Sequence, residues 1–429
     1  MPTTSTTATT STTYRELFRT PEFRPLFVST GAQIAAQTLS GLALATLVYR
    51  TTASPLLSSL SMFGPSLAQM LGATFFLSAA DRLPPRAALT ASSLAFAAGT
   101  AVLALPSLPL GAVFAVILLQ GVVASVGGGV RWGLLNEILP RDGYVTGRSV
   151  FNIMNGLTQV TGFATGAALL ALLAPRPTLL LAAGLHLLAA LTAAVGLTPR
   201  HPRSTGRPSL RATWRTNALL WSSRPRRLTY LGLWIPNGLV VGCESLFVAH
   251  DPGSAGTLFA CAALGMLIGD IWVGRFLTPA RRARLAHPLL LLLAAPYTLF
   301  VLHPSLPLAA ALATLASTGF AASLIQQEHL MSLTPPHLSG HALGLHSAGM
   351  LTLQGTAATL AGTLAQLTSP ATAITTMATL SATVTGGLVV AGRCGGGGGG
   401  GKPASPKRLG GRLRGETTAP APRPRQRPS

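Results

Sequence analysis

The chain has 429 residues, of which 48% are hydrophobic and 10% are charged, and its formal net charge is +21. Soluble globular proteins carry about 25% charged residues, so this composition excludes an ordinary soluble domain. The cations lie in loops and tails between apolar runs. We therefore interpret them as determinants of membrane topology, with a lipid bilayer as the partner and no nucleic acid.

The first 24 residues are polar and rich in threonine, and we expect them to form a cytoplasmic N-terminal segment. The apolar run that follows is longer than the h-region of a signal peptide, so we expect no cleavage. Six apolar runs, each near the length of about 20 residues that spans a bilayer, predict an N-terminal six-helix bundle over residues 25–198. The expected spans are Pro25–Val48, Pro55–Ala79, Ala87–Leu105, Leu110–Val130, Ser149–Ala174 and Thr178–Leu197.

A basic stretch, residues 199–227, separates the two apolar halves of the chain. It holds eight arginines and no acidic residue. Because Lys and Arg resist translocation across a membrane, we expect this stretch to be a cytoplasmic central loop. The eight are Arg200, Arg203, Arg207, Arg211, Arg215, Arg224, Arg226 and Arg227.

Six further apolar runs predict a C-terminal six-helix bundle over residues 228–391. Residues 392–429 are rich in Gly, Pro and Arg and cannot bury a core, so we expect a disordered cytoplasmic tail. The expected spans are Leu228–Ala249, Ala255–Phe276, Leu285–Leu302, Leu306–Met331, Gly340–Leu367 and Ala371–Val390.

The distribution of cations supports this topology independently of hydropathy. With twelve spans and the N-terminus inside, the external loops hold only Arg50 and Arg176, and nearly every other basic residue falls on the inside. The pattern follows the positive-inside rule. It favours a multi-pass membrane protein with both termini in the cytoplasm, and we expect the membrane to be a bacterial cytoplasmic membrane.

Two loops six spans apart carry related motifs. The loop after the second span contains Asp81, Arg82 and Arg86, and the loop after the eighth span contains Gly274 and Arg275. A carboxylate beside arginines at a helix end can form ion pairs that break when two bundles move against each other. Related loops at this separation are what a duplicated fold predicts.

Two further motifs lie in the fourth and eighth spans. Gly265 and Gly269 form a small-xxx-small pair, which predicts a close contact between the eighth span and another helix. Arg131 closes the fourth span, and Pro140-Arg141-Asp142 ends the same helical segment with charge at the cytoplasmic face.

These loops resemble the major facilitator superfamily, and the junction that begins at Arg131 is similar to that of its bacterial drug-efflux members. The resemblance covers about residues 15–391. It implies an all-α integral membrane fold with twelve transmembrane helices in two pseudo-symmetric six-helix bundles and a substrate site between them at the midplane. Ile117 stands where the antiporter branch has an Arg, and Phe163 stands where it has the Pro of a Gly-Pro pair.

Ionisable groups inside a membrane are costly, so we treat them as functional candidates. Glu244 in the seventh span and Asp270 in the eighth are the proton-coupling candidates, because a buried carboxylate can take up and release a proton. The competing interpretation pairs Asp270 with a loop arginine. Arg131 and Glu328 lie near span ends, where their side chains can reach the interface.

Neutral polar residues in the first, fifth, seventh and tenth spans predict a substrate cavity. Those of the first and fifth spans have helical spacing, and Pro236 predicts a kink in the seventh span. The competing interpretation is hydrogen bonding between helices, worth about 1 kcal/mol for each bond. The cavity candidates are Gln33, Gln37, Asn152, Asn155, Gln159, Asn237 and Gln326.

The sequence lacks the motifs of nucleotide-binding loops, zinc proteases and serine hydrolases, so we expect neither an enzyme nor ATP-driven transport. No cofactor or metal is expected, and a monomer is favoured. We expect a secondary active transporter that exports a small lipophilic compound by alternating access, for which proton coupling is one energy source. The alternatives are an uptake permease for a small metabolite and a receptor-like relative that does not transport.

Overall fold

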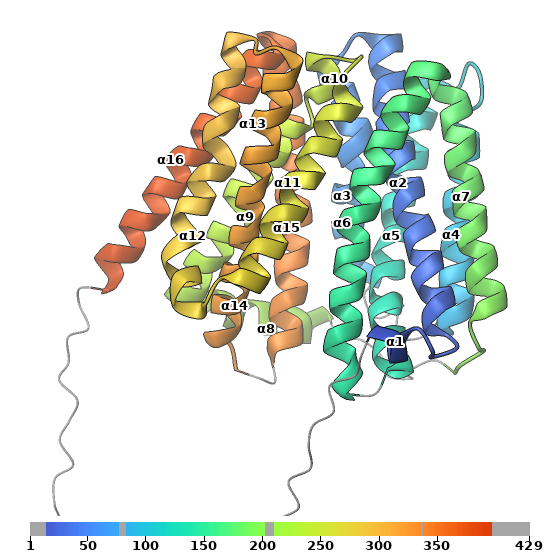
Figure 1. Cartoon of the computed structure of the whole chain (residues 1–429), viewed down its shortest axis with the longest axis horizontal. Helices are drawn as coiled ribbons and strands as arrows, with labels where there is room; N and C mark the ends of the chain where they lie inside the picture. Colours follow the sequence, from blue (N-terminus) through green and yellow to red (C-terminus); the bar gives the residue numbers. More distant parts are fainter. Residues whose placement is uncertain (1–13, 77–82, 140, 202–209, 336–337, 397–429) are drawn as a thin grey trace, which may run out of the picture.

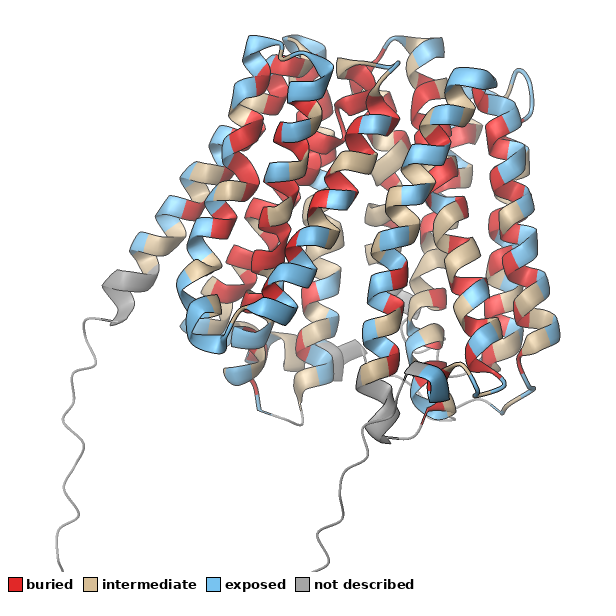
Figure 2. Cartoon of the chain, in the orientation of Figure 1, coloured by how far each residue is buried: buried red, intermediate tan, exposed pale blue. Residues whose placement is uncertain are grey.

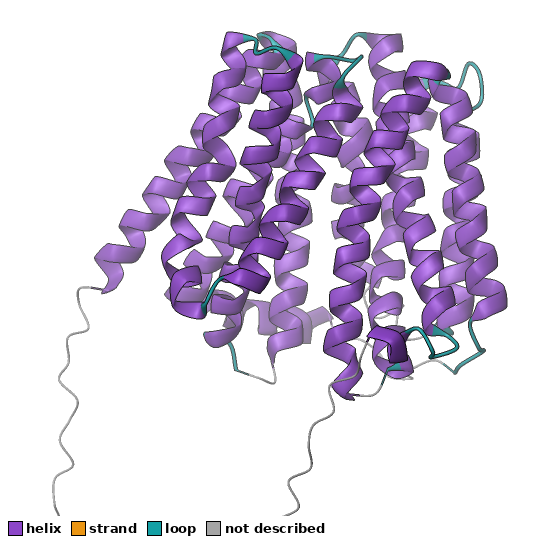
Figure 3. Ribbon diagram, in the orientation of Figure 1, coloured by secondary structure: helices purple, strands orange, loops and turns teal. Residues whose placement is uncertain are grey.

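The computed structural model describes residues 14–76, 83–139, 141–201, 210–335 and 338–396. Over these residues every regular element is a helix (Figure 3). The long helices stand side by side in two bundles, one from each half of the chain (Figure 1). The predicted all-helical membrane fold with two six-helix bundles is confirmed.

The first bundle consists of α2 to α7, one helix for each predicted span. Prolines lie at the starts of α3, α4 and α7. Proline is favourable in the first turn because the N–H groups there have no hydrogen-bond partner within the helix. α5 and α6 extend beyond the predicted apolar runs, because a helix can continue past the bilayer with polar residues. The elements are α1 (Tyr14–Leu17), α2 (Phe23–Thr52), α3 (Pro55–Phe76), α4 (Pro85–Leu103), α5 (Leu110–Ile138), α6 (Arg141–Leu172) and α7 (Pro175–Gly196).

The second bundle consists of α9 to α16, and three of its six crossings are made of more than one element. The seventh crossing combines α9 with α10, the ninth α12 with η1, and the tenth α13 with η2 and α14. The elements are α9 (Arg224–Glu244), α10 (Phe247–His250), α11 (Ala255–Phe276), α12 (Pro279–Ala294), η1 (Ala295–Leu302), α13 (Leu306–Thr318), η2 (Gly319–Ala321), α14 (Ala322–Ser332), α15 (Ser339–Leu367) and α16 (Pro370–Gly396).

Part of the central basic stretch forms a further helix, α8 (Leu210–Ser222), which lies across the lower end of the bundles in Figure 1. Trp221 near its end stacks on Tyr230 and Trp234 of α9, with ring centroids 6.1 and 5.5 Å apart. These stacked rings attach α8 to the second bundle.

The outer surface of both bundles carries large apolar side chains, as helices that contact lipid require. Within the described ranges, nine helical segments are long and apolar enough to cross a membrane. α3, α6 and α15 are not among the nine and complete the two bundles. Buried residues lie on the inner helix faces (Figure 2), whereas Leu172 is 81% exposed and Val195 is 78% exposed. Apolar residues thus serve both packing and lipid contact.

The two bundles meet along α3 and α15 on one side and along α6 and α11 on the other. Glycines allow this contact. A Cβ atom added at Gly355 of α15 would lie 2.4 Å from the side chain of Leu67, and one at Gly256 of α11 would lie 2.6 Å from that of Ala167. Both distances are shorter than a van der Waals contact, so only glycine permits these helices to approach so closely.

The chain crosses the bundles so that basic residues gather at one end. We call the end that carries Arg86, Arg200, Arg224 and Arg275 the basic end, and the opposite end the far end. Three hydrogen bonds between described residues join the bundles at the far end. Tyr49 Oη donates to the Ala249 carbonyl (3.3 Å), Ser54 Oγ to Gln366 Oε1 (2.7 Å) and Ser59 Oγ to the Ser245 carbonyl (3.1 Å).

Candidate functional site: a cavity between the bundles

A cavity of about 340 Å³ lies between the two bundles. We call it the central cavity. Helices α3 and α6 of the first bundle and α9, α11, α14 and α15 of the second contribute to its wall, together with η2. Both halves of the chain therefore shape this space, which is the arrangement that alternating access between two bundles requires.

Half of the residues that line the central cavity are aromatic or sulfur-containing. Phe163 of α6 stacks on Phe259 of α11 across the interface between the bundles, with ring centroids 4.9 Å apart. Such rings, with flexible methionine side chains between them, form an adaptable apolar surface. The residues of this type in the wall are Met62, Phe63, Phe163, Phe259, Met266, Phe320 and Met350.

Glu244 lines the central cavity at the end of α9 and is 5% exposed. Its Oε1 atom accepts hydrogen bonds from Tyr297 Oη of η1 and Ser317 Oγ of α13, both at 3.3 Å. A carboxyl group away from water is stable only when its oxygens have such partners. The second bundle thus holds Glu244 in a fixed position at the cavity wall.

Asp270 lines the same cavity from α11 and is exposed within it. No hydrogen bond or ion pair joins its carboxylate to another residue in the described parts of the chain. The structure therefore brings both predicted coupling carboxylates to one cavity, with Glu244 held by two donors and Asp270 left open to an occupant.

The three polar candidates on α6 are divided between the cavity and its surroundings. Gln159 lines the central cavity, and its Nε2 atom donates to Asn155 Oδ1 at 3.1 Å. Asn155 and Asn152 are exposed and follow toward the basic end of the same helix. Together they form a polar strip on α6 that leads to Gln159.

The remaining neutral candidates lie outside the central cavity. Gln33 is buried inside the first bundle, where its Oε1 atom lies 3.0 Å from His186 Nδ1, and Gln37 is exposed on the same helix. Asn237 is buried in α9 and donates to the Leu233 carbonyl at 2.6 Å. Gln326 lines a different pocket, inside the second bundle. The spacing of polar residues along a helix therefore does not predict whether they face the cavity or another helix.

The predicted gating residues lie at the basic end where they are described. Asp81 and Arg82 fall outside the described residues, and Arg86 is half-buried in the first turn of α4. Arg131 is half-buried on α5.

In the loop after α11, Arg282 makes the contacts, and it is not one of the residues predicted from the motif. Arg275 is exposed, whereas Arg282 Nη2 donates to the Gly274 carbonyl at 2.8 Å. Arg282 Nη1 also lies 3.6 Å from Glu328 Oε2, which links α12 to α14.

A carboxylate cluster at the basic end was not predicted from the sequence. Glu22, just before α2, accepts hydrogen bonds from the backbone N–H of Thr198 (2.6 Å), the Thr198 hydroxyl and Arg200. The Arg200 guanidinium also reaches Glu137 at the end of α5, at 3.8 Å. Burial disfavours the charged form of Glu22, but these hydrogen bonds and the arginine charge outweigh it, so the pKa of Glu22 is lowered. The cluster joins the ends of α2, α5 and α7.

Comparison with known proteins gives the family. The sequence pattern of the Major Facilitator Superfamily matches residues 26–349. A search of curated proteins found no match.

Solved structures with the same fold include a mutant of the nucleoside transporter NupG, with TM-score 0.71 and 13% identity, covering 86% of this chain and 98% of that one. A POT family transporter in complex with 5-aminolevulinic acid has TM-score 0.67 and 12% identity, covering 85% and 94%. A bacterial homolog of the human lysosomal transporter Spinster, in an inward-facing and occupied conformation, has TM-score 0.61 and 13% identity, covering 86% and 94%.

The family match covers most of the chain, and the two-bundle fold agrees with it. The protein is thus a multi-pass membrane transporter, not an enzyme. The chain belongs to the Major Facilitator Superfamily.

Proposed function

We propose that this transporter exports a small lipophilic compound by alternating access, and that Glu244 and Asp270 couple the export to protons. The observation that carries the proposal is the central cavity between the bundles, which combines an aromatic and methionine-rich wall with these two carboxylates. An apolar wall with few polar groups is typical of sites for small, largely apolar ligands.

The charges of the cavity favour a substrate with a basic nitrogen. Glu244 and Asp270 line it, and no Lys, Arg or His is among the described residues of its wall. A cation is attracted both by the carboxylates and by the faces of the four phenylalanine rings. Asp270, which has no partner in the described parts of the chain, is the group that meets the cation first.

Proton coupling follows if substrate and proton compete for the same carboxylates. When a proton occupies the carboxyl group, the cavity loses the charge that attracts the substrate cation. Binding of the substrate then favours release of the proton, and binding of the proton favours release of the substrate. Exchange of substrate against protons requires this coupling. The two hydrogen bonds to Glu244 keep this group at the wall in either state.

Uptake of a polar metabolite is the second candidate. It is favoured by solved structures with the same fold, which include a nucleoside transporter and a POT family transporter in complex with 5-aminolevulinic acid. The polar strip Asn152, Asn155 and Gln159 could serve such a solute. The aromatic wall of the cavity favours export of a lipophilic compound over this candidate.

The test is accumulation of lipophilic dyes and antibiotics, basic and neutral, in an efflux-deficient bacterial host that expresses the full chain, with and without a protonophore. We expect lower accumulation of basic compounds, and the protonophore should abolish the difference. Glu244→Gln and Asp270→Asn should each remove most of the export. Glu328→Gln is the matched control, because this exposed carboxylate lies outside the central cavity.

Each alternative has its own result. Raised accumulation of a polar solute would establish uptake and contradict export. No change for any compound, with the protein present in the membrane fraction, would favour a receptor-like role. Export that persists unchanged in both carboxylate variants would contradict the coupling assignment.

A further inference from the structure

A further pocket lies inside the second bundle and is separate from the central cavity. Its volume is about 720 Å³, and α9, α12, α14 and α16 line it near the basic end. We call it the second-bundle pocket. None of the residues in its wall lines the central cavity, so a substrate between the bundles does not account for this space.

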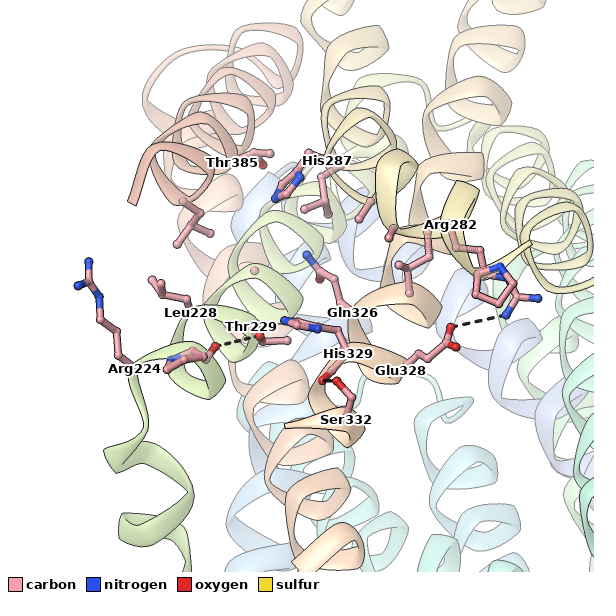
Figure 4. Close-up of a pocket in the computed structure, with 18 residues that line it drawn as sticks. Arg224, Leu228, Thr229, Arg282, His287, Gln326, Glu328, His329, Ser332 and Thr385 are labelled. Carbon is pink, nitrogen blue, oxygen red and sulfur yellow. Dashed lines mark hydrogen bonds and ion pairs between the residues drawn. The ribbon is translucent and has the colours of Figure 1, made fainter. Parts of the chain in front are cut away.

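One edge of the pocket is polar and carries cations (Figure 4). Arg224 lies at one side, with its guanidinium turned outward. The pair of Arg282 and Glu328 lies at the other side, and His329 lies between them. Glu328 compensates Arg282 at 3.6 Å. The Arg224 guanidinium is exposed and has no hydrogen-bond or ion-pair partner in the described residues. The edge therefore has an uncompensated positive charge, which belongs to the arginine-rich central stretch, residues 199–227.

The interior of the pocket has a polar group without a partner. Gln326 points its amide toward the space between α9 and α12 (Figure 4), and its Oε1 atom is buried without a hydrogen bond to any described residue. An unsatisfied buried amide oxygen costs about 1 to 3 kcal/mol. It indicates a hydroxyl or N–H donor in the occupant of the pocket.

Most of the other lining residues are apolar, and Thr229, His287, Ser332 and Thr385 add polar groups to the wall. Leu228, Ala286, Leu290 and Ile325 form the inner part, and Leu388 of α16 closes one side. Beyond this point α16 leans away from the other helices (Figure 1). A pocket with a cationic edge and an apolar interior, near the end of a membrane helix, matches a molecule with an anionic head and a hydrocarbon chain.

We propose that the second-bundle pocket binds an anionic phospholipid from the leaflet at the basic end. The phosphate lies beside His329, and the exposed Arg224 side chain turns toward it. A hydroxyl of the headgroup donates to Gln326 Oε1, and an acyl chain runs along Leu228, Leu290 and Leu388. Basic pockets between membrane helices select anionic headgroups by this combination of charge and hydrogen bonds. The occupant holds α16 against α9 and α12.

The test is native mass spectrometry of the full chain purified in detergent. Phosphatidylglycerol and phosphatidylcholine with identical acyl chains are titrated, and the fraction of protein with bound lipid is measured. We expect preference for phosphatidylglycerol and about a fivefold loss of its affinity in Arg224→Gln, the amount expected for one basic residue near a membrane surface. Arg227→Gln is the matched control, because Arg227 lies on the same helix but does not line the pocket.

Further arms separate the possible occupants. Ala286→Trp fills the apolar interior and should abolish lipid retention while the thermal unfolding midpoint shows a folded protein. Equal binding of both lipids, or an effect of Arg227→Gln as large as that of Arg224→Gln, would overturn the proposal. Full displacement of phosphatidylglycerol by millimolar inorganic phosphate would identify a site for small anions and overturn it too. Glu244→Gln should leave lipid binding unchanged.

Discussion

Glu22 and Glu244 are buried carboxylates in opposite circumstances. Glu22 accepts hydrogen bonds from Thr198 and Arg200 at the basic end, where one partner carries a full charge. Among the described residues, Glu244 at the cavity wall accepts only from the two neutral hydroxyl groups of Tyr297 and Ser317. A carboxylate with a cationic partner stays ionised and stabilises the fold. A carboxyl group held by neutral donors keeps its hydrogen bonds when it gains a proton.

Glu22 gives the first prediction. Its pKa is lowered in the folded state, so its contribution to stability is complete above the pKa of an unfolded glutamate, about 4.3, and is lost as pH falls through the folded pKa. Glu22→Gln should lower the free energy of unfolding by about 1.5 to 3 kcal/mol at pH 7, the range for hydrogen bonds to charged groups. Thermal unfolding midpoints of the purified protein between pH 7 and pH 3 measure both effects.

The control for Glu22 is Glu328→Gln. The Glu328 side chain is 57% exposed and its ion pair with Arg282 is 3.6 Å long, so its loss should change stability by less than about 1 kcal/mol. The difference in midpoint between wild type and Glu22→Gln should shrink as pH falls. A difference that stays constant down to pH 3 would contradict the assigned role.

At the scale of helices, the contact of α11 with α13 depends on two glycines. A Cβ atom at Gly265 would lie 2.2 Å from the Thr314 carbonyl oxygen, and one at Gly269 would lie 2.4 Å from that of Thr318. The close helix contact predicted from this small-xxx-small pair is confirmed. Backbone atoms occupy the space, and they cannot move aside as a flexible side chain could.

The second prediction concerns this contact. Gly269→Val should push α11 away from α13 and lower stability by about 1 to 3 kcal/mol, the cost of overpacking. Because Asp270 is the next residue, transport should also fall. Gly274→Val is the control on the same helix, since nothing lies within 4 Å of a Cβ atom there. Equal unfolding midpoints for the two variants would show that the contact between α11 and α13 does not determine stability.

The same elements show how far the sequence could be read. All twelve crossings were predictable, because a run of about 20 apolar residues has few alternatives to a membrane helix. The division of the ninth crossing into α12 and η1, and the helix α8, were not predicted, since both depend on packing between distant segments. In η1, Tyr297 donates to Glu244, which is more than fifty residues away in sequence.

The candidate site was predictable mainly for its charged residues. Carboxylates within apolar runs stand out because their burial is costly, and the structure brings Glu244 and Asp270 to one cavity. Neutral amide side chains in a sequence indicate a functional site less clearly. Gln33 and Gln159 look alike in sequence, yet the first meets His186 inside a bundle and the second lines the cavity. The aromatic wall of the cavity could not be distinguished from ordinary core residues.

At the scale of the whole molecule, the two bundles are tied together at the far end. The shortest of the three bonds there joins Ser54, before α3, to Gln366 near the end of α15, at 2.7 Å between side chains. Alternating access requires these bonds to break when the far end opens. Bonds between neutral groups suit this purpose, because each contributes only about 1 kcal/mol and can be exchanged for water.

The last prediction tests this movement directly. Ser54→Cys and Gln366→Cys together, in a chain whose three native cysteines are replaced, should be joined by a short bifunctional methanethiosulfonate. The native side chains touch through the far end of the long Gln366 side chain, so two shorter cysteine side chains leave a gap that a short linker fills. This reducible cross-link should hold the far end closed and reduce transport to the level of the empty host, and a reductant should restore transport. Each single cysteine variant, treated identically, should keep its activity. Full transport by the cross-linked protein would mean that the far end does not open, and that substrate passes by another route.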